Sequence, residues 1–232
     1  KEIKPWLKKE WVIPPKQDEE FVAAMERVLD VYRRPYDPLA PVVCMDEMPK
    51  QIIGEYRDEV IGSDGVVRFD TEYRRLGTCN VLLAVEPLAG LRHLRVFETK
   101  TKEDWARFTR EIEGLYPSAK KVTLVCDNLN THGPGSWYRT FPPEEAKRLM
   151  DKFEIVHTPK HGSWLDIAEI ELSVLSRQCL GRRLDSMGKI EREANVWRER
   201  RNAGHAKVDW QFTAQDARIK LKHLYPAFTC ST

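Results

Sequence analysis

Short apolar runs alternate with amphipathic stretches along the chain, and this alternation predicts an α/β fold. Apolar residues at helical spacing predict a helix over 21–32. Apolar runs predict strands over 42–46, around 51–55, on both sides of a turn at 87–90, over 121–128 and over 153–159. Further helices are expected over 101–114, from 142, over 163–180, near 187–201 and near 214–223. The charged, glycine-containing stretch 56–77 indicates a loop or an irregular hairpin.

The order of these elements predicts the sheet. Short loops join the first three strands, which should therefore be antiparallel neighbours. The later strands alternate with helices and should be parallel. The pattern thus predicts a mixed sheet with helices on its faces and extra helices at the C-terminal end. The chain contains no internal repeat and no low-complexity tract.

Composition changes this picture little. The 232 residues allow one large domain or two small ones, and 41% hydrophobic residues are enough for a core. The net charge of +2 does not indicate a polyanionic partner for the whole molecule. Residues 177–207, however, carry nine Lys or Arg against four acids, and this segment could face nucleic acid or be an ordinary solvated helix surface.

Cysteine usage and the N-terminal sequence indicate the cellular context. The five cysteines are scattered and none forms a CxxC pair, which is typical of a reducing compartment rather than of a disulfide framework or a cysteine zinc site. No apolar stretch reaches the length of a membrane span, and no signal peptide is visible. The chain begins at Lys1 rather than Met, which we interpret as a fragment whose N-terminal part has been removed.

Two aspartates follow apolar runs in the same manner. Asp46 comes after Val42-Val43-Cys44-Met45, and Asp127 follows the run that ends in Cys126. Ligand sites gather at strand ends in α/β sheets, so neighbouring strands would set the two carboxylates side by side. Such carboxylates repel and raise each other's pKa, and a divalent cation removes the conflict. Hard oxygen ligands favour Mg²⁺ or Mn²⁺ over zinc. The alternative is that each aspartate is an ordinary turn residue.

A metal site of this kind needs a third acid, and the helix expected over 163–180 offers Asp166, Glu169 and Glu171. On a helical wheel of about 100° per residue, Glu169 and Glu171 lie in two different polar strips. Periodicity therefore does not choose between them. Glu47 points to the opposite face of its strand from Asp46, and we interpret it as a structural residue.

Three motifs in this order, "VVCMDEMPKQ", "TLVCDNLNTH" and "TPKHGSWLDIAEIELSVLSRQCL", resemble the DDE transposases of the ribonuclease-H-like, retroviral-integrase superfamily. The resemblance is strongest to the bacterial insertion-sequence transposases related to mariner, of the insertion-sequence-630 type. It implies a ribonuclease-H-like fold: a five-stranded mixed sheet flanked by helices. It also implies that Asp46, Asp127 and Glu169 are the catalytic, metal-binding acids, because the catalytic Glu of the family lies four residues after the Leu of "SWL". Relatives usually carry Asn at position 166, so Asp166 could add charge to the metal site or serve as a spare ligand.

The resemblance also implies an activity, cofactors and partners. It implies DNA cleavage and strand transfer in cut-and-paste transposition into TA target dinucleotides, with two Mg²⁺ or Mn²⁺ ions as cofactors. The expected partners are double-stranded DNA, as transposon ends and target, and a second subunit in a homodimer. No membrane partner is expected. The expected location is the bacterial cytoplasm, in association with the nucleoid.

Three regions are expected on this basis. Residues 1–40 would form an arm and a helix that follow a missing helix-turn-helix region. Residues 41–182 would form the catalytic core, and residues 183–232 a helical extension of that core. Because the missing region would recognise the transposon ends, this chain alone should bind DNA with little sequence preference.

Several basic residues and one histidine lie near the acid motifs. Candidate DNA-binding residues are Lys160, His161, Arg177, Arg182 and Arg183. His132, five residues after Asp127, is a candidate auxiliary residue. Lys160, His161 and His132 are also about as typical of ordinary loop polarity.

Three alternative functions remain open at this point. A ribonuclease-H-like endonuclease that cuts without strand transfer would use the same acids and metals. A non-catalytic DNA-binding module derived from a transposase would not need an intact acid triad. A phosphatase of the haloacid type needs a second Asp two residues after the first, where this chain has Met48.

Overall fold

The computed structural model describes residues 19–57, 60–68 and 71–225, and its centre is a five-stranded sheet. The strand order is β5-β4-β1-β6-β7. The strands are β1 (Val42–Glu55), β4 (Tyr73–Glu86), β5 (Leu91–Phe97), β6 (Val122–Cys126) and β7 (Phe153–His157). The β1–β4 and β4–β5 pairs are antiparallel, whereas β1–β6 and β6–β7 are parallel. The mixed sheet predicted from the sequence is confirmed.

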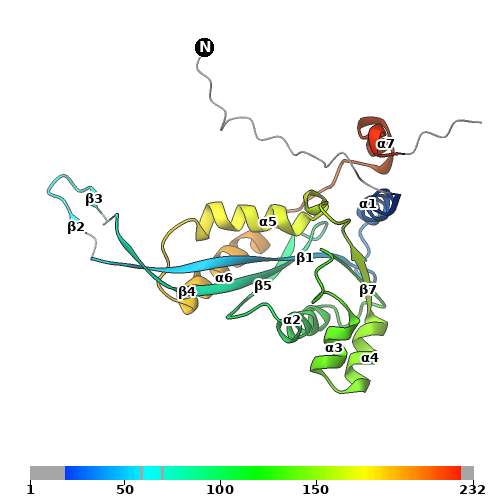
Figure 1. The fold of residues 1–232 in the computed structure, drawn as a ribbon, viewed down its shortest axis with the longest axis horizontal. Helices are drawn as coiled ribbons and strands as arrows, with labels where there is room; N and C mark the ends of the chain where they lie inside the picture. Colours follow the sequence, from blue (N-terminus) through cyan, green and yellow to red (C-terminus); the bar gives the residue numbers. More distant parts are fainter. Residues whose placement is uncertain (1–18, 58–59, 69–70, 226–232) are drawn as a thin grey trace, which may run out of the picture.

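Helices cover both faces of this sheet, as Figure 1 shows. Successive residues of β1 face opposite layers, so Cys44 packs into one core and Val43 and Met45 into the other. The layer on the Cys44 face consists of α1 (Glu19–Tyr32), α5 (Ile167–Leu175), α6 (Met187–Ala203) and α7 (Ala214–Lys220). The opposite layer consists of α2 (Lys102–Leu115), α3 (Pro134–Thr140) and α4 (Pro143–Lys152).

Strand β1 does not end at Asp46, and this part of the sequence interpretation is wrong. The strand continues to Glu55 in register with β4, so the separate strand expected around 51–55 is its second half. Pairing with β6 stops at Cys44, which leaves an open edge that tolerates Pro49. The second half of β1 has fewer apolar residues because this part of β1 and the paired part of β4 extend beyond the two cores.

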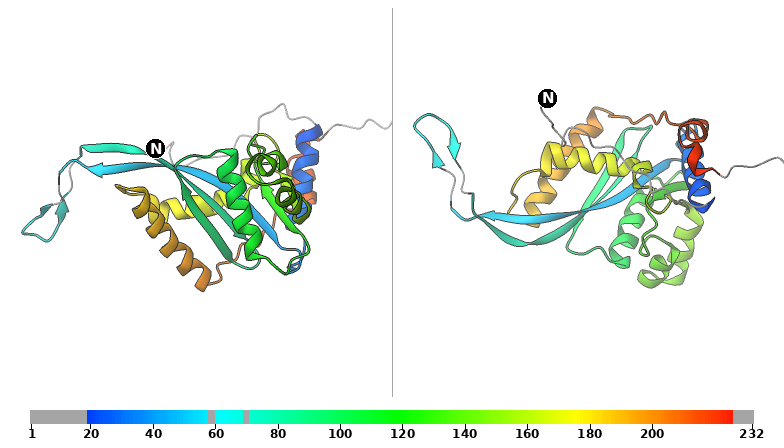
Figure 2. Two further views of the ribbon diagram at one scale, coloured as in Figure 1. Left: turned by 90° about the horizontal axis from the view of Figure 1, so that it is seen from below. Right: turned by 45° about the horizontal axis from the view of Figure 1, so that its top comes forward.

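The outer halves of β1 and β4 form a two-stranded ribbon that projects from the body of the molecule (Figures 1 and 2). Near its tip lies a short antiparallel pair, β2 (Val60–Ile61) and β3 (Val67–Arg68). In the described part of the stretch 56–77, β2 pairs with β3 and β4 begins at Tyr73, which agrees with the irregular hairpin rather than the loop.

The helix predictions hold with two corrections. Thr101 caps α2, with its side chain accepting from the N–H of Asp104 in a capping box. Helix α3 was not predicted. The long helix expected over 163–180 is divided into a 3₁₀ turn (Ser163–Leu165), α5 and a π-helical turn (Ser176–Leu180). It breaks at Asp166, whose extended backbone and side chain form the N-cap of α5.

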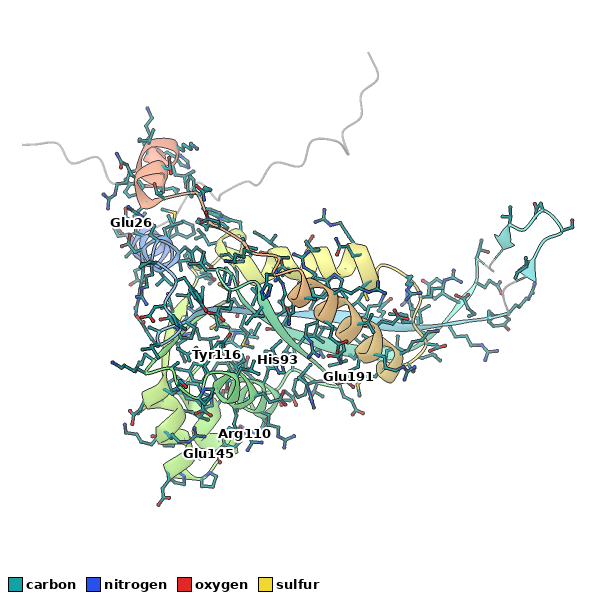
Figure 3. All side chains as sticks on the ribbon, turned by 180° about the vertical axis from the view of Figure 1, so that it is seen from behind. Glu26, His93, Arg110, Tyr116, Glu145 and Glu191 are labelled. Carbon is teal, nitrogen blue, oxygen red and sulfur yellow. The ribbon has the colours of Figure 1, made fainter. Side chains whose placement is uncertain are left out.

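The extra C-terminal helices are confirmed as α6 and α7, followed by a 3₁₀ turn (Lys222–Leu224). Helix α7 returns to the other end of the described chain, where Arg218 Nε pairs with Glu26 Oε1 of α1 at 2.7 Å (Glu26 is labelled in Figure 3). The basic arm expected at the N-terminus, residues 1–18, lies outside the described residues. No helix in the part of the chain that the structure describes is long and apolar enough to cross a membrane.

Candidate active site

Asp46 and Asp127 come from adjacent strands. Strands β1 and β6 pair in parallel with Cys44 opposite Val125, and Asp46 and Asp127 each follow this last pair by two residues. Asp46 shares a strand face with Cys44, which packs in the core that contains α5. Asp46 therefore faces the α5 layer. The side-by-side placement of the two strands, on which the metal-site prediction depended, is confirmed.

Helix α5 brings Glu169 to the same place. Glu169 lies in the first turn of α5, is half-buried, and its Oε2 atom is buried without a hydrogen-bond partner. The charges of Asp127 and Glu169 both raise the pKa of Asp46. Three carboxyl groups that are 42 and 81 positions apart in the sequence thus share one electrostatic environment.

Asp46 is the most perturbed of these three acids. Burial is the main cause that raises its pKa from 3.8 to about 7. The backbone N–H of Glu47, which donates to Asp46 Oδ1 at 2.8 Å, lowers the pKa, whereas the charges of Glu47, Asp127 and Glu169 raise it. Without a counter-charge, about half of the Asp46 side chains would therefore carry a proton near neutral pH.

Asp166 is a fourth carboxyl group in this environment. It is 2% exposed, and its Oδ1 atom accepts from the N–H of Ala168 at 2.8 Å, while Oδ2 is buried without a partner. Burial raises the pKa of Asp166 well above its usual range, and the charges of Asp46, Asp127 and Glu169 add to this effect. The residue that departs from the family pattern therefore lies beside the predicted acids.

These carboxyl groups have the chemistry of a divalent-cation site. A buried carboxylate oxygen without a partner is costly, and a hard cation such as Mg²⁺ or Mn²⁺ satisfies it. Asp166 and Glu169 each contribute such an oxygen. Within the described ranges, no group of three or more His, Cys, Asp or Glu is already arranged to hold a metal ion. The acids are thus coupled electrostatically without converging on one point in this conformation.

His132 joins Asp127 to Glu47 on the other face of the sheet. Its Nδ1 atom lies 2.6 Å from Asp127 Oδ1, and its Nε2 atom lies 3.3 Å from Glu47 Oε2. Burial is the largest single effect and would lower the pKa of His132, but the contacts with Asp127, Cys126 and Glu47 together outweigh it and raise the pKa to about 12. Burial likewise opposes ionisation of Asp127, yet pairing with His132 holds its pKa below 3.8.

Sequence reasoning placed Glu47 on the face opposite Asp46, and that placement is confirmed, but it missed the partner. The sequence did contain a local signal: Glu47 follows Val43 and Met45 on the same strand face, and both of these pack in the core of the α2 layer. A carboxylate at that position indicates a buried partner. Nothing local could identify His132 as its partner, because 85 residues separate the two.

Glu171 has partners of its own. Arg92 Nε donates to Glu171 Oε2 at 2.9 Å, and Arg201 donates to Glu171 Oε1 at 2.8 Å. The side chains of Glu171 and Arg92 are 2% and 0% exposed. This arrangement ties α5 to β5 and α6, and it agrees with the interpretation that Glu171 lies outside the acid set. Sequence reasoning did not single out Arg92.

The candidate DNA-binding residues form two separate groups. Lys160 and His161 are exposed in the loop between β7 and α5, where His161 adopts a left-handed conformation with φ of 64°. Arg177, Arg182 and Arg183 follow the other end of α5. The loop pair thus precedes the first turn of α5, which carries Glu169, whereas the arginines follow the C-terminal end of that helix.

Two of these arginines already have carboxylate partners. Arg182 pairs with Glu193 at 2.6 Å. Arg183 pairs with Glu55 at 2.5 Å and donates to the backbone carbonyls of Thr71 and Glu72, so it contacts the outer end of the β1–β4 ribbon. Arg177 is exposed and lines a groove of about 520 Å³.

Comparison with known proteins adds a family and several similar folds. A family model described as DDE superfamily endonuclease matches residues 41–191. Among solved structures, the chain is similar to the Mos1 strand transfer complex, at 14% identity and a TM-score of 0.50, over 86% of this chain and 66% of that one. It is also similar to the Mos1 mariner paired end complex with Mn, at 14% identity and a TM-score of 0.48, over 88% of this chain and 68% of that one. A third is the catalytic domain of Mos1 mariner transposase, at 14% identity and a TM-score of 0.46, over 85% of this chain and 99% of that one. No curated protein matches the chain.

At 14% identity the likeness concerns the fold alone. It agrees with the strand order and with the helices on both faces, and the expected ribonuclease-H-like fold is confirmed. The chain spans about two thirds of the Mos1 chain in the strand transfer complex, 66% by length.

Proposed function

Because the chain belongs to the DDE superfamily endonucleases, we propose that it is the catalytic part of a DNA transposase that requires divalent cations. The observation that carries the proposal is the common environment of Asp46, Asp127 and Glu169, which three different elements bring together. In this proposal the three acids are the catalytic residues and bind two Mg²⁺ or Mn²⁺ ions. Asp166 supplies additional negative charge beside them.

The proposed reaction is an in-line displacement at phosphorus. Bound cations supply stabilisation of the negative charge on the attacking and leaving oxygens. The protein's part is to fix the acids on rigid elements: Asp46 within a strand, Asp127 directly after one, and Glu169 on a capped helix. Water first displaces the transposon-end 3′-oxygen and frees a hydroxyl. That hydroxyl then displaces a 3′-oxygen in the target strand, so one phosphodiester bond forms as one breaks.

The finer assignments rest on the motifs. We propose a bacterial insertion-sequence transposase of the type related to mariner, which acts in the nucleoid of the cytoplasm as a homodimer on two transposon ends and inserts at TA. Lys160 and His161 are exposed beside the first turn of α5 and would contact DNA close to the acids. The other candidates would contact the DNA backbone farther from the acids: Arg177, Arg182 and Arg183. The proposed regions remain 1–40, 41–182 and 183–232.

An endonuclease without strand transfer is the second candidate, because the family description names that activity alone. The two functions use the same acids and differ only in the second displacement. Joining of a labelled duplex with a free 3′-hydroxyl to a plasmid separates them. Labelled plasmid supports the transposase, and nicked plasmid without label supports the endonuclease.

The test of the acid set is nicking of supercoiled plasmid in Mg²⁺, Mn²⁺ or EDTA. The variants are Asp46→Asn, Asp127→Asn and Glu169→Gln. The matched control is Glu171→Gln, which makes the same change on the same helix and is assayed at a temperature at which it is folded. We expect the wild-type protein to nick the plasmid only with metal. The nicking rate should fall by at least about 100-fold in the first three variants and stay unchanged in the control.

Two outcomes would contradict this assignment. Nicking that survives Glu169→Gln but is lost in Glu171→Gln would move the third acid by two residues. Absence of nicking by the folded wild-type protein, both alone and joined to an N-terminal DNA-binding region, would instead support a non-catalytic DNA-binding module.

A further inference from the structure

The imidazole of His132 lies between two carboxylates in a dry part of the structure. Its side chain is 2% exposed and that of Glu47 is 7% exposed. The ring stacks on Trp105 of α2, with 5.7 Å between ring centroids and 24° between planes. The backbone N–H of His132 donates to Leu129 O at 2.9 Å, which holds the loop after β6. Nδ1 lies within hydrogen-bond distance of Asp127 Oδ1, whereas the 3.3 Å contact of Nε2 with Glu47 Oε2 is a charge contact without hydrogen-bond geometry. The Asp127 contact and the stack on Trp105 therefore fix the ring, and the charge of Glu47 faces its other nitrogen.

The same contact divides the two oxygens of Asp127. Oδ1 lies 2.6 Å from His132 Nδ1 and also accepts from the N–H of Leu129 at 3.1 Å. Among the residues that the structure describes, Oδ2 has no such hydrogen bond, and the Asp127 side chain is 42% exposed. One oxygen is therefore held by contacts within the protein, while the side chain as a whole remains partly exposed. This division suits a carboxylate that must present one oxygen to a cation in a fixed direction.

Glu47 completes the arrangement from the far side of β1. Because side chains alternate along a strand, the backbone that directs Asp46 toward α5 directs Glu47 toward α2 and His132. Lys100 Nζ lies 3.7 Å from the second oxygen of Glu47. One dipeptide in β1 thus contributes an acid to the candidate metal site and, through His132, holds the acid contributed by β6.

We propose that His132, itself held by Glu47, is a positioning residue that orients Asp127 for cation binding. The proposal rests on the proposed function, in which Asp127 is a metal ligand. Neither His132 nor Glu47 contacts the cation or the DNA in this scheme. Loss of a residue that orients a metal ligand typically weakens metal affinity by about 10- to 100-fold.

The chain contains a matched control for this arrangement. His93 of β5, labelled in Figure 3, pairs through Nε2 with Glu111 of α2 at 2.9 Å and stacks on Phe108 with 5.4 Å between centroids. Here too a histidine pairs with a glutamate and stacks on an aromatic ring of α2, but its carboxylate partner is Glu111 rather than Asp127. Substitution of His93 therefore reports what is lost when such a pair is only structural.

The experiment measures Mn²⁺ affinity without DNA, from the electron paramagnetic resonance signal of free Mn²⁺, at pH 8. The variants are His132→Ala, His132→Asn and Glu47→Gln, with His93→Gln as control and Asp46→Asn to identify the acid site. Far-UV circular dichroism verifies that each variant is folded. We expect His132→Ala to weaken Mn²⁺ binding by about 10- to 100-fold and His93→Gln to leave it within about twofold.

Two graded results would support positioning specifically. The amide nitrogen of His132→Asn lies near the place of Nδ1, so this variant should retain more affinity than His132→Ala. The effects of Glu47→Gln and His132→Ala should be less than additive in the double variant, because Glu47 reaches Asp127 through the ring. Additive effects, or folded His132 variants with wild-type affinity, would overturn the proposal.

The wild-type protein and Asp46→Asn separate this proposal from the proposed function. Wild-type Mn²⁺ binding that Asp46→Asn abolishes, together with unchanged affinity in the His132 variants, would overturn the positioning role alone. Wild-type protein that binds no Mn²⁺, or binds it equally well with Asp46→Asn, would overturn both.

Discussion

Replacement of Glu171 by Gln should destabilise the fold strongly, although the residue lies two positions from a proposed catalytic acid. The change removes one charge while keeping the size of the side chain. It leaves Arg92, whose side chain is 0% exposed, and Arg201, whose side chain is 23% exposed, without their shared carboxylate. Arg92 keeps only backbone carbonyl partners, those of Gly90 and Ala206.

The magnitude follows from the burial of this ion pair. Breaking a buried pair by removing one partner costs about 3–5 kcal/mol, because the remaining charge is left buried and uncompensated. Since Arg201 is partly exposed and can recover solvation, we expect the lower end, about 3 kcal/mol. For a protein of this size that corresponds to a fall in Tm of roughly 6–12 °C.

The assay is thermal unfolding in EDTA at pH 8, followed by differential scanning calorimetry, with Glu169→Gln beside Glu171→Gln. Glu169 has a buried oxygen without a hydrogen-bond partner, so its replacement should not lower the unfolding free energy. A Glu171→Gln variant within about 1 kcal/mol of wild type, or a Glu169→Gln variant that is equally destabilised, would refute the reasoning.

Two further predictions concern Asp46 and Gly90. The raised folded-state pKa of Asp46 gives stability that is fully present below pH 3.8 and lost as pH rises through about 7. Asp46→Asn should therefore stabilise the metal-free protein at pH 8, by at most about 4 kcal/mol, and should not stabilise it at pH 3.5. Urea unfolding in EDTA measures this, and equal effects at the two pH values would argue against it. Gly90 has φ of 72°, and a Cβ there would lie 2.6 Å from the carbonyl carbon of His205. Gly90→Ala should lower stability by more than about 2 kcal/mol, and an unchanged urea midpoint would contradict this.

Local patterns were sufficient for most of the fold. Apolar periodicity located the strands of the central sheet and most helices, because burial of one face requires a repeat that is visible in the sequence. The cap of α2 at Thr101 is local in the same way, since its partner Asp104 lies three residues away. Alternation along β1 correctly placed Asp46 and Glu47 on opposite faces. The three acids themselves were chosen from family motifs, and their catalytic role stays a prediction.

Contacts between distant segments were decided only by the tertiary structure. Strand β1 continues past Asp46 because it pairs with β4 as far as Glu55. The polar residues of that stretch give no sign of this pairing in the sequence. Glu171 and Arg92 are 79 residues apart, and Glu47 and His132 are 85 apart, so no local repeat relates them. Such pairs form because the sheet brings distant backbones together and buried charges must then find a partner. A sequence records which residues carry those charges, whereas their partners are set by the packing of strands and helices.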